Sequence, residues 1–225
     1  MNNPLIVALD VPDQGAALRL VETLGPSVPF YKIGLQLFTR CGPGVVEAVK
    51  TTGAKVFLDL KYHDIPNTVR HSVESARALG VDFLTIHLAG GAAMIRAAAE
   101  AAAPGAVLGV TVLTSSNRET LRETGVEGAV EDQVLRLARL AAENGVTGVV
   151  ASPLEVSLLR QVFGAGLTIV TPGVRPQWAE ANDQQRTMTP AAAIRAGADF
   201  LVIGRPITGQ PNPREAAERI LAELT

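Results

Sequence analysis

The stretch KVFLDLKYHDIPNT, residues 55 to 68, contains the most informative change of pattern in the chain. Its first half is a short apolar run rich in β-forming residues, and its second half carries Pro66, a residue that the first turn of a helix accepts. We therefore expect a strand over Lys55 to Lys61, followed by a helix that begins near Asp64 or Ile65. A buried strand followed by a helix is the repeating unit of parallel α/β folds.

The same unit recurs along the whole chain. Apolar runs are followed by stretches rich in Ala, Leu and Glu, such as Ala92 to Ala103 and Val130 to Glu143. The expected strands are Leu5 to Val11, Phe30 to Leu35, Lys55 to Lys61, Phe83 to Ala89, Val107 to Leu113, Gly148 to Ser152, Leu167 to Gly173 and Phe200 to Ile207. Eight such units predict an α/β fold of the (β/α)8 TIM barrel type, with residues 1–225 forming a single domain.

An open, doubly wound sheet is the other architecture that alternating strands and helices could form. Sheets of that kind that bind dinucleotides usually place a glycine-rich turn after the first strand. Here the first strand is followed by Asp10-Val11-Pro12-Asp13, which contains no GxGxxG pattern. The closed barrel is therefore favoured.

The composition limits the classes of partner. The chain has 20 Lys and Arg against 22 Asp and Glu, so we expect neither nucleic acid nor an anionic membrane surface as a partner, and a small molecule fits better. Cys41 is the single cysteine and cannot form an intramolecular disulfide. The first residues lack the features of a signal peptide, and the apolar run from Leu5 to Leu9 is too short to span a bilayer. We expect a cytoplasmic protein.

Polar residues end several of the apolar runs. In a (β/α)8 barrel the active site lies at the carboxyl ends of the strands, where such residues converge. Asp59 and Lys61 are the most informative pair, because strand alternation places both on the side that faces the barrel mouth. Burying opposite charges in an apolar run is costly unless they are paired or take part in chemistry. Asp64 follows in the turn, where capping the next helix is an alternative role.

Two histidines invite a metal or acid-base interpretation. His87 ends the fourth strand and His63 follows Lys61 in the turn, but neither has a partner at the spacing of metal ligands. We expect structural roles for both, and no metal site.

The pattern D-x-K-x-x-D-I-P-x-T, from Asp59 to Thr68, resembles the signature of the orotidine 5'-phosphate decarboxylases. Further segments resemble motifs of that family, in the family's order, so that the resemblance spans nearly the whole chain. These segments are the ALD that ends in Asp10, the YKIG around Lys32, the TPGVR of Thr171 to Arg175, the ANDQ of Ala181 to Gln184 and the IGR of Ile203 to Arg205. The resemblance implies decarboxylation of orotidine 5'-phosphate to UMP in pyrimidine biosynthesis, without a cofactor.

The resemblance also implies roles for individual residues. Lys32, Asp59, Lys61 and Asp64 would form a charged catalytic network, in which Lys61 stabilises and protonates the carbanion at C6 of the pyrimidine. Asp64 and Thr68 would reach the neighbouring site across a homodimer interface. The substrate contacts would be Asp10 and Lys32 for the ribose, Thr114 for the pyrimidine, and Gln184, Gly204 and Arg205 for the phosphate, with Arg175 as a further binding residue. The polar stretch from Val174 to Met188 is a candidate for closing over the phosphate.

Two alternatives stay open at this point. Related barrels such as 3-keto-L-gulonate 6-phosphate decarboxylase and hexulose-6-phosphate synthase use the same D-x-K-x-x-D framework with Mg²⁺. Those relatives place an acidic ligand where this chain has Lys32, and a lysine there would repel the cation. A non-catalytic module that binds a sugar phosphate would keep the phosphate contacts without needing Lys61.

Overall fold

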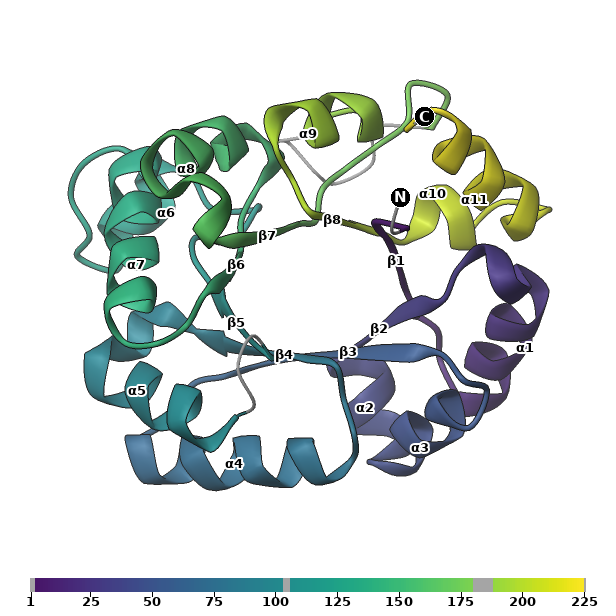
Figure 1. Ribbon diagram of the computed structural model, residues 1–225, viewed down its shortest axis with the longest axis horizontal. Coiled ribbons are helices and arrows are strands. Elements are labelled where there is room, and N and C mark those ends of the chain that lie inside the picture. The colour runs from purple at the N-terminus through teal and green to yellow at the C-terminus, as the bar shows by residue number, and fades with distance from the viewer. Residues whose placement is uncertain (1–2, 103–105, 180–187, 225) are drawn as a thin grey trace.

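The computed structural model describes residues 3–102, 106–179 and 188–224. Its strands are all parallel and pair in sequence order around a closed ring, from β1 to β8 and back to β1 (Figure 1). The strands are β1 (Leu5–Ala8), β2 (Phe30–Gly34), β3 (Lys55–Tyr62), β4 (Phe83–His87), β5 (Val107–Val110), β6 (Gly148–Val150), β7 (Thr168–Thr171) and β8 (Phe200–Ile203). The predicted single-domain (β/α)8 barrel is confirmed.

Helices surround this ring on the outside (Figure 1). They are α1 (Gln14–Leu24), α2 (Leu35–Cys41), α3 (Gly44–Lys50), α4 (Pro66–Ala78), α5 (Gly91–Ala101), α6 (Arg118–Glu123), α7 (Val130–Glu143), α8 (Val156–Phe163), α9 (Pro190–Ala196), α10 (Arg205–Thr208) and α11 (Pro213–Ala222). Short 3₁₀ turns lie at Gly25–Ser27, Leu88–Gly90, Pro153–Glu155 and Gly164–Gly166. Within the described ranges, no helix combines the length and the apolar character needed to cross a membrane.

The expected strands have the right number and positions, but most of them end earlier than the apolar pattern predicts. The pattern extends the eighth strand to Ile207, whereas β8 ends at Ile203 and α10 begins at Arg205. The reason is that apolar residues continue beyond the last strand pair: Leu9, Val112 and Ile207 are buried without belonging to a strand. An apolar run indicates buried residues, and in this barrel the buried residues continue past the strand ends into the segments that follow.

The interior of the barrel has an aromatic layer below a polar one. Four phenylalanine rings fill the amino end, with centroids 5.4 to 6.1 Å apart: Phe30, Phe57, Phe83 and Phe200. Two residues further along β2, β3 and β4, the next inward positions are Lys32, Asp59 and Thr85. The phenylalanine layer therefore forms the floor of a polar site at the carboxyl end.

Candidate active site

A cavity of about 320 Å³ opens at the carboxyl ends of the strands. Its walls combine apolar residues of the barrel interior, such as Phe57 and Val202, with polar residues from the strand ends and following loops. Eight residues expected from the sequence line it: Asp10, Lys32, Asp59, Lys61, Thr114, Arg175, Gly204 and Arg205. Residues that are scattered from position 10 to position 205 thus meet around one space.

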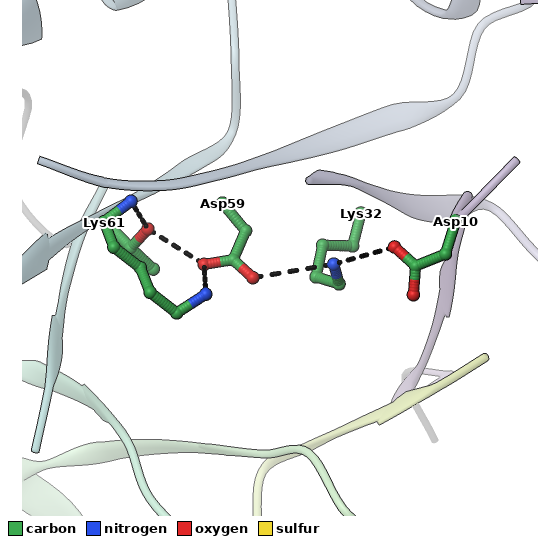
Figure 2. Close-up of polar contacts among 5 residues, drawn as sticks. Asp10, Lys32, Asp59 and Lys61 are labelled. Atoms are coloured by element: carbon green, nitrogen blue, oxygen red, sulfur yellow. Dashed lines mark hydrogen bonds and ion pairs between the residues drawn. The ribbon is translucent and has the colours of Figure 1, made fainter. Parts of the chain in front are cut away.

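Four of these side chains form a row of alternating charge (Figure 2). The Nζ atom of Lys61 lies 2.9 Å from Oδ1 of Asp59. The other carboxylate oxygen of Asp59 lies 3.5 Å from Nζ of Lys32, and that same Nζ lies 3.4 Å from Oδ1 of Asp10. Asp59 therefore sits between two ammonium groups, one on each of its oxygens.

The position of Asp59 in this row decides its charge. Only 13% of its side chain is exposed. Burial raises the pKa of the Asp59 carboxyl group, but the positive charges of Lys32 and Lys61, with hydrogen bonds from Lys61 and Thr85, outweigh that effect and bring the pKa below its usual value. The carboxylate is consequently ionised at neutral pH.

The backbone of β3 is irregular where it carries the catalytic candidates. Leu58 pairs with Leu84 and Tyr62 with Ile86, so the register of β3 against β4 shifts between Leu58 and Tyr62. Among the described residues, Lys61 is the one non-glycine residue with a positive φ, at 51°. Such a conformation costs a non-glycine residue about 1–2 kcal/mol. Lys61 does face the cavity with Asp59, as expected, but on a bulged strand rather than through regular alternation.

Two neighbours of the charged row were missed in the sequence. Thr85 is fully buried on β4; its hydroxyl accepts the backbone N–H of Lys61 at 2.8 Å and donates to Oδ1 of Asp59 at 3.0 Å. Gly34 leaves room for an ammonium group, because a Cβ atom there would lie 2.9 Å from Nζ of Lys32. The sequence did contain a signal for Thr85: it is the one threonine in the apolar run FLTIH, and strand alternation places it on the same face as the inward-facing Phe83, two positions earlier.

Another part of the cavity is suited to an anion. Arg175 follows β7, is buried, and donates its backbone N–H to the carbonyl of Met188 at 2.9 Å. Gly204 follows β8, and the exposed Arg205 begins α10. Gln184 lies outside the described residues, as does most of the stretch expected to close over a phosphate, so both remain predictions.

Asp64 and Thr68 do not line the cavity of their own chain. Both are exposed, beyond the end of β3. Helix α4 starts at Pro66 with Ile65 as its N-cap residue, and the carboxylate of Asp64 accepts only the adjacent N–H of Ile65 among the described hydrogen bonds, at 2.6 Å. The capping role considered for Asp64 is therefore not the one observed. Ile65 beside it is a large apolar residue with 66% of its surface exposed.

His87 and His63 stack against each other, with ring centroids 5.6 Å apart and planes 28° apart. Nδ1 of His87 is buried and has no hydrogen-bond partner within the described part of the protein. Burial lowers the pKa of His87, and the neighbouring His63 and Lys61 lower it further. His87 is accordingly neutral at pH 7. Across the described ranges, no three His, Cys, Asp or Glu side chains are grouped as a metal site would require.

Comparisons with known proteins agree with this geometry. Residues 3–220 match the model of the "Orotidine 5'-phosphate decarboxylase / HUMPS family". The orotidine 5'-phosphate decarboxylase of Syntrophotalea carbinolica is 53% identical, with 98% of this chain and 94% of the relative covered, and that of Moorella thermoacetica is 51% identical, with 98% and 91% covered. A crystal structure of the orotidine 5'-phosphate decarboxylase from Lactobacillus acidophilus superimposes with a TM-score of 0.88 at 37% identity, covering 100% of both chains.

The lowered pKa of His87 predicts how the free energy of unfolding depends on pH. Because the folded protein protonates His87 less readily than the unfolded chain, stability should fall as the pH drops below about 6.5. The substitution His87→Phe keeps a ring beside His63 but removes the titration. Urea unfolding at pH 7 and pH 5 should show a smaller loss of unfolding free energy in the variant than in the wild type. An unchanged loss in His87→Phe would refute the assignment.

Proposed function

The chain belongs to the orotidine 5'-phosphate decarboxylase / HUMPS family and decarboxylates orotidine 5'-phosphate to UMP, a step of pyrimidine biosynthesis, and we propose that Lys61 carries the chemistry. The observation behind this proposal is the ion pair of 2.9 Å between Lys61 and the ionised, largely covered Asp59 at the wall of the cavity. It fixes an ammonium group where a substrate that enters the cavity would meet it.

The reaction requires a positive charge outside the substrate ring. When CO₂ leaves C6 of the pyrimidine, the electron pair stays in an orbital in the ring plane, where the π-system cannot delocalise it. A fixed ammonium group stabilises this developing charge without reorganising during the reaction. Lys61 then donates a proton, so that a C6–H bond forms as one N–H bond breaks, and solvent reprotonates the amine. This proposal needs neither a metal nor an organic cofactor.

Asp59 and Lys32 would act on this step through Lys61. Asp59 holds the ammonium group in place, and Lys32 neutralises the second carboxylate oxygen, which limits the negative charge near the substrate. Asp59 would also face the carboxylate that leaves as CO₂. Two like charges about 4 Å apart repel by about 4 kcal/mol at an effective dielectric constant near 20, which is a secondary contribution to the rate.

The arrangement of the strands suggests how the substrate lies. In the closed ring, β7 stands opposite β3, and β8 is next to β7 (Figure 1). Arg175 follows β7, and Gly204 and Arg205 follow β8, so these residues come from the side of the ring across from β3, the strand that carries Lys61. A phosphate held there would direct the pyrimidine toward Lys61 and Thr114. We assign the ribose to Asp10 and Lys32, which lie between these two ends. Gln184 is proposed as a further phosphate contact on the resemblance alone.

Lys32 argues against the magnesium-dependent alternative. Its Nζ lies 3.5 Å from Asp59 and 3.4 Å from Asp10, where it would repel a divalent cation bound to the same carboxylates. A module that only binds a sugar phosphate would have no use for two partly buried lysine–aspartate contacts, because burying such charges is costly. The activity measurement below tests whether the reaction needs a metal and whether it needs Lys61.

We further propose a homodimer in which Asp64 and Thr68 complete the neighbouring site. Support comes from the exposed position of both residues at the mouth end of β3, next to the exposed Ile65, and from the family pattern that contains them. A carboxylate from a second chain would add to the charges around Lys61. A cytoplasmic location is also proposed, and the single Cys41 suits a reducing compartment.

The role of Lys61 is tested by the loss of orotidine 5'-phosphate absorbance in the presence of EDTA. Wild-type protein should keep its full rate, whereas Lys61→Ala should lose at least about 10³-fold in kcat, equivalent to about 4 kcal/mol. Lys50→Ala is a matched control, because Lys50 pairs with Asp82 at the opposite end of the barrel. Activity that disappears in EDTA and returns with Mg²⁺, or an active Lys61→Ala protein, would contradict the proposal.

The shared site is tested by mixing two inactive variants, Lys61→Ala and Asp64→Ala. In a hybrid dimer, one site contains both substitutions and the other contains neither. Random exchange of equal amounts should therefore restore about a quarter of the wild-type activity, since half of the dimers are hybrids with one intact site each. Mass spectrometry of differently tagged chains establishes the exchange. Confirmed hybrids without activity would rule out a site shared through Asp64.

A further inference from the structure

We propose that Thr85 is the positioning residue that holds Lys61 in its reactive place. This inference rests on the proposed role of Lys61 and extends it to a residue of another strand. Thr85 lies in the middle of β4 and has no exposed surface. It does not line the cavity, so it acts on the reaction only through the residues that it contacts.

The first contact holds the backbone of Lys61. The register of β3 against β4 shifts between Leu58 and Tyr62, which takes Lys61 out of the regular ladder of strand hydrogen bonds. Its backbone N–H instead donates to Oγ1 of Thr85 at 2.8 Å. This hydrogen bond satisfies a group that would otherwise be left without its strand partner, in a residue whose φ of 51° is already unfavourable.

The second contact holds the side chain of the same lysine. A backbone N–H can only donate, so the Thr85 hydroxyl acts as its acceptor and its single hydrogen is free for another partner. That hydrogen points to Oδ1 of Asp59, at 3.0 Å. The same oxygen accepts from Nζ of Lys61 at 2.9 Å.

One hydroxyl therefore closes a ring of hydrogen bonds around the catalytic lysine. The ring runs from the Lys61 N–H to Thr85, from Thr85 to Asp59, and from Asp59 back to Nζ of Lys61. Both the backbone and the charged end of Lys61 are thus fixed against the same buried side chain. A donor to a carboxylate also stabilises its charge, which favours the ionised form of Asp59 that Lys61 needs.

Removing the hydroxyl should affect the chemical step more than substrate binding. Without it, the N–H of Lys61 loses its acceptor and Oδ1 of Asp59 loses one of its donors. The ammonium group can then move from its place, and a displacement of about 1 Å can lower a rate by 10²-fold. The phosphate and ribose contacts come from other strands and keep their geometry.

The test compares kcat and KM for Thr85→Val, Thr85→Ser and Thr111→Val. The nearly isosteric Thr85→Val should lower kcat by 10- to 100-fold with KM and the Kd of UMP within about threefold of the wild type. Thr85→Ser keeps a hydroxyl and should retain kcat within a few-fold. Thr111→Val removes a similarly buried hydroxyl, which donates to the Val150 carbonyl at 3.0 Å. In this variant the same carbonyl still accepts a hydrogen bond from the backbone N–H of residue 111. Its kcat should stay near the wild-type value.

A wild-type kcat in Thr85→Val, a rise in KM alone, or an equal loss in Thr85→Ser would overturn the proposal. If Thr85→Val does not fold, as judged by near-ultraviolet circular dichroism, Thr85→Ala takes its place with the same expected loss, and a wild-type kcat in that variant overturns the proposal. These outcomes are distinct from failure of the proposed function. An active Lys61→Ala protein would end the role of Lys61 itself, whereas an active Thr85→Val protein leaves that role intact.

Discussion

The Asp59 carboxylate between two lysine ammonium groups is the interaction on which the rest of the site depends. Partial burial of three charged groups is costly, and close contacts between opposite charges compensate for this cost. Asp59 has such contacts, with Lys61 at 2.9 Å, Lys32 at 3.5 Å and the Thr85 hydroxyl at 3.0 Å. Deleting any one partner would leave another charge poorly compensated, so the arrangement holds its members in one geometry.

The barrel supplies the surroundings that this row of charges needs. The phenylalanine layer closes the interior below it, and the strand ends open it to a cavity above. Groups with a purely structural task lie at the amino end, where Asp82 accepts the N–H of Val56 and pairs with Lys50. Stability and chemistry therefore occupy opposite ends of one barrel, as is general for this fold. The irregular backbone of Lys61 stands at the chemical end, where strain is commonly found.

Much of the fold and of the site is predictable from the sequence because the signals are local. Each apolar run indicates a strand, and the polar residues at its end indicate the barrel mouth, which is where Asp10, Lys32, Asp59 and Lys61 lie. The bulge at Lys61 and the part played by Thr85 are not predictable in this way, since both depend on how β3 pairs with β4. The strand ends are overestimated because burial in a turn leaves the same apolar pattern as burial in a strand. The roles expected for Asp64 and Thr68 involve a second chain, so the structure of a single chain does not test them.

The pKa of Asp59 shows most directly whether this carboxylate is held ionised between the two lysines. A ¹³C-detected pH titration of the Asp59 carboxyl carbon, with its signal assigned by comparison with Asp59→Asn, measures the pKa in the free enzyme. We expect a pKa below about 3.9, the usual value for aspartate, because the charges of Lys32 and Lys61 outweigh burial. A pKa at or above that value would mean that burial prevails over the two lysine charges, and it would contradict the picture of an ionised carboxylate that holds Lys61 in place.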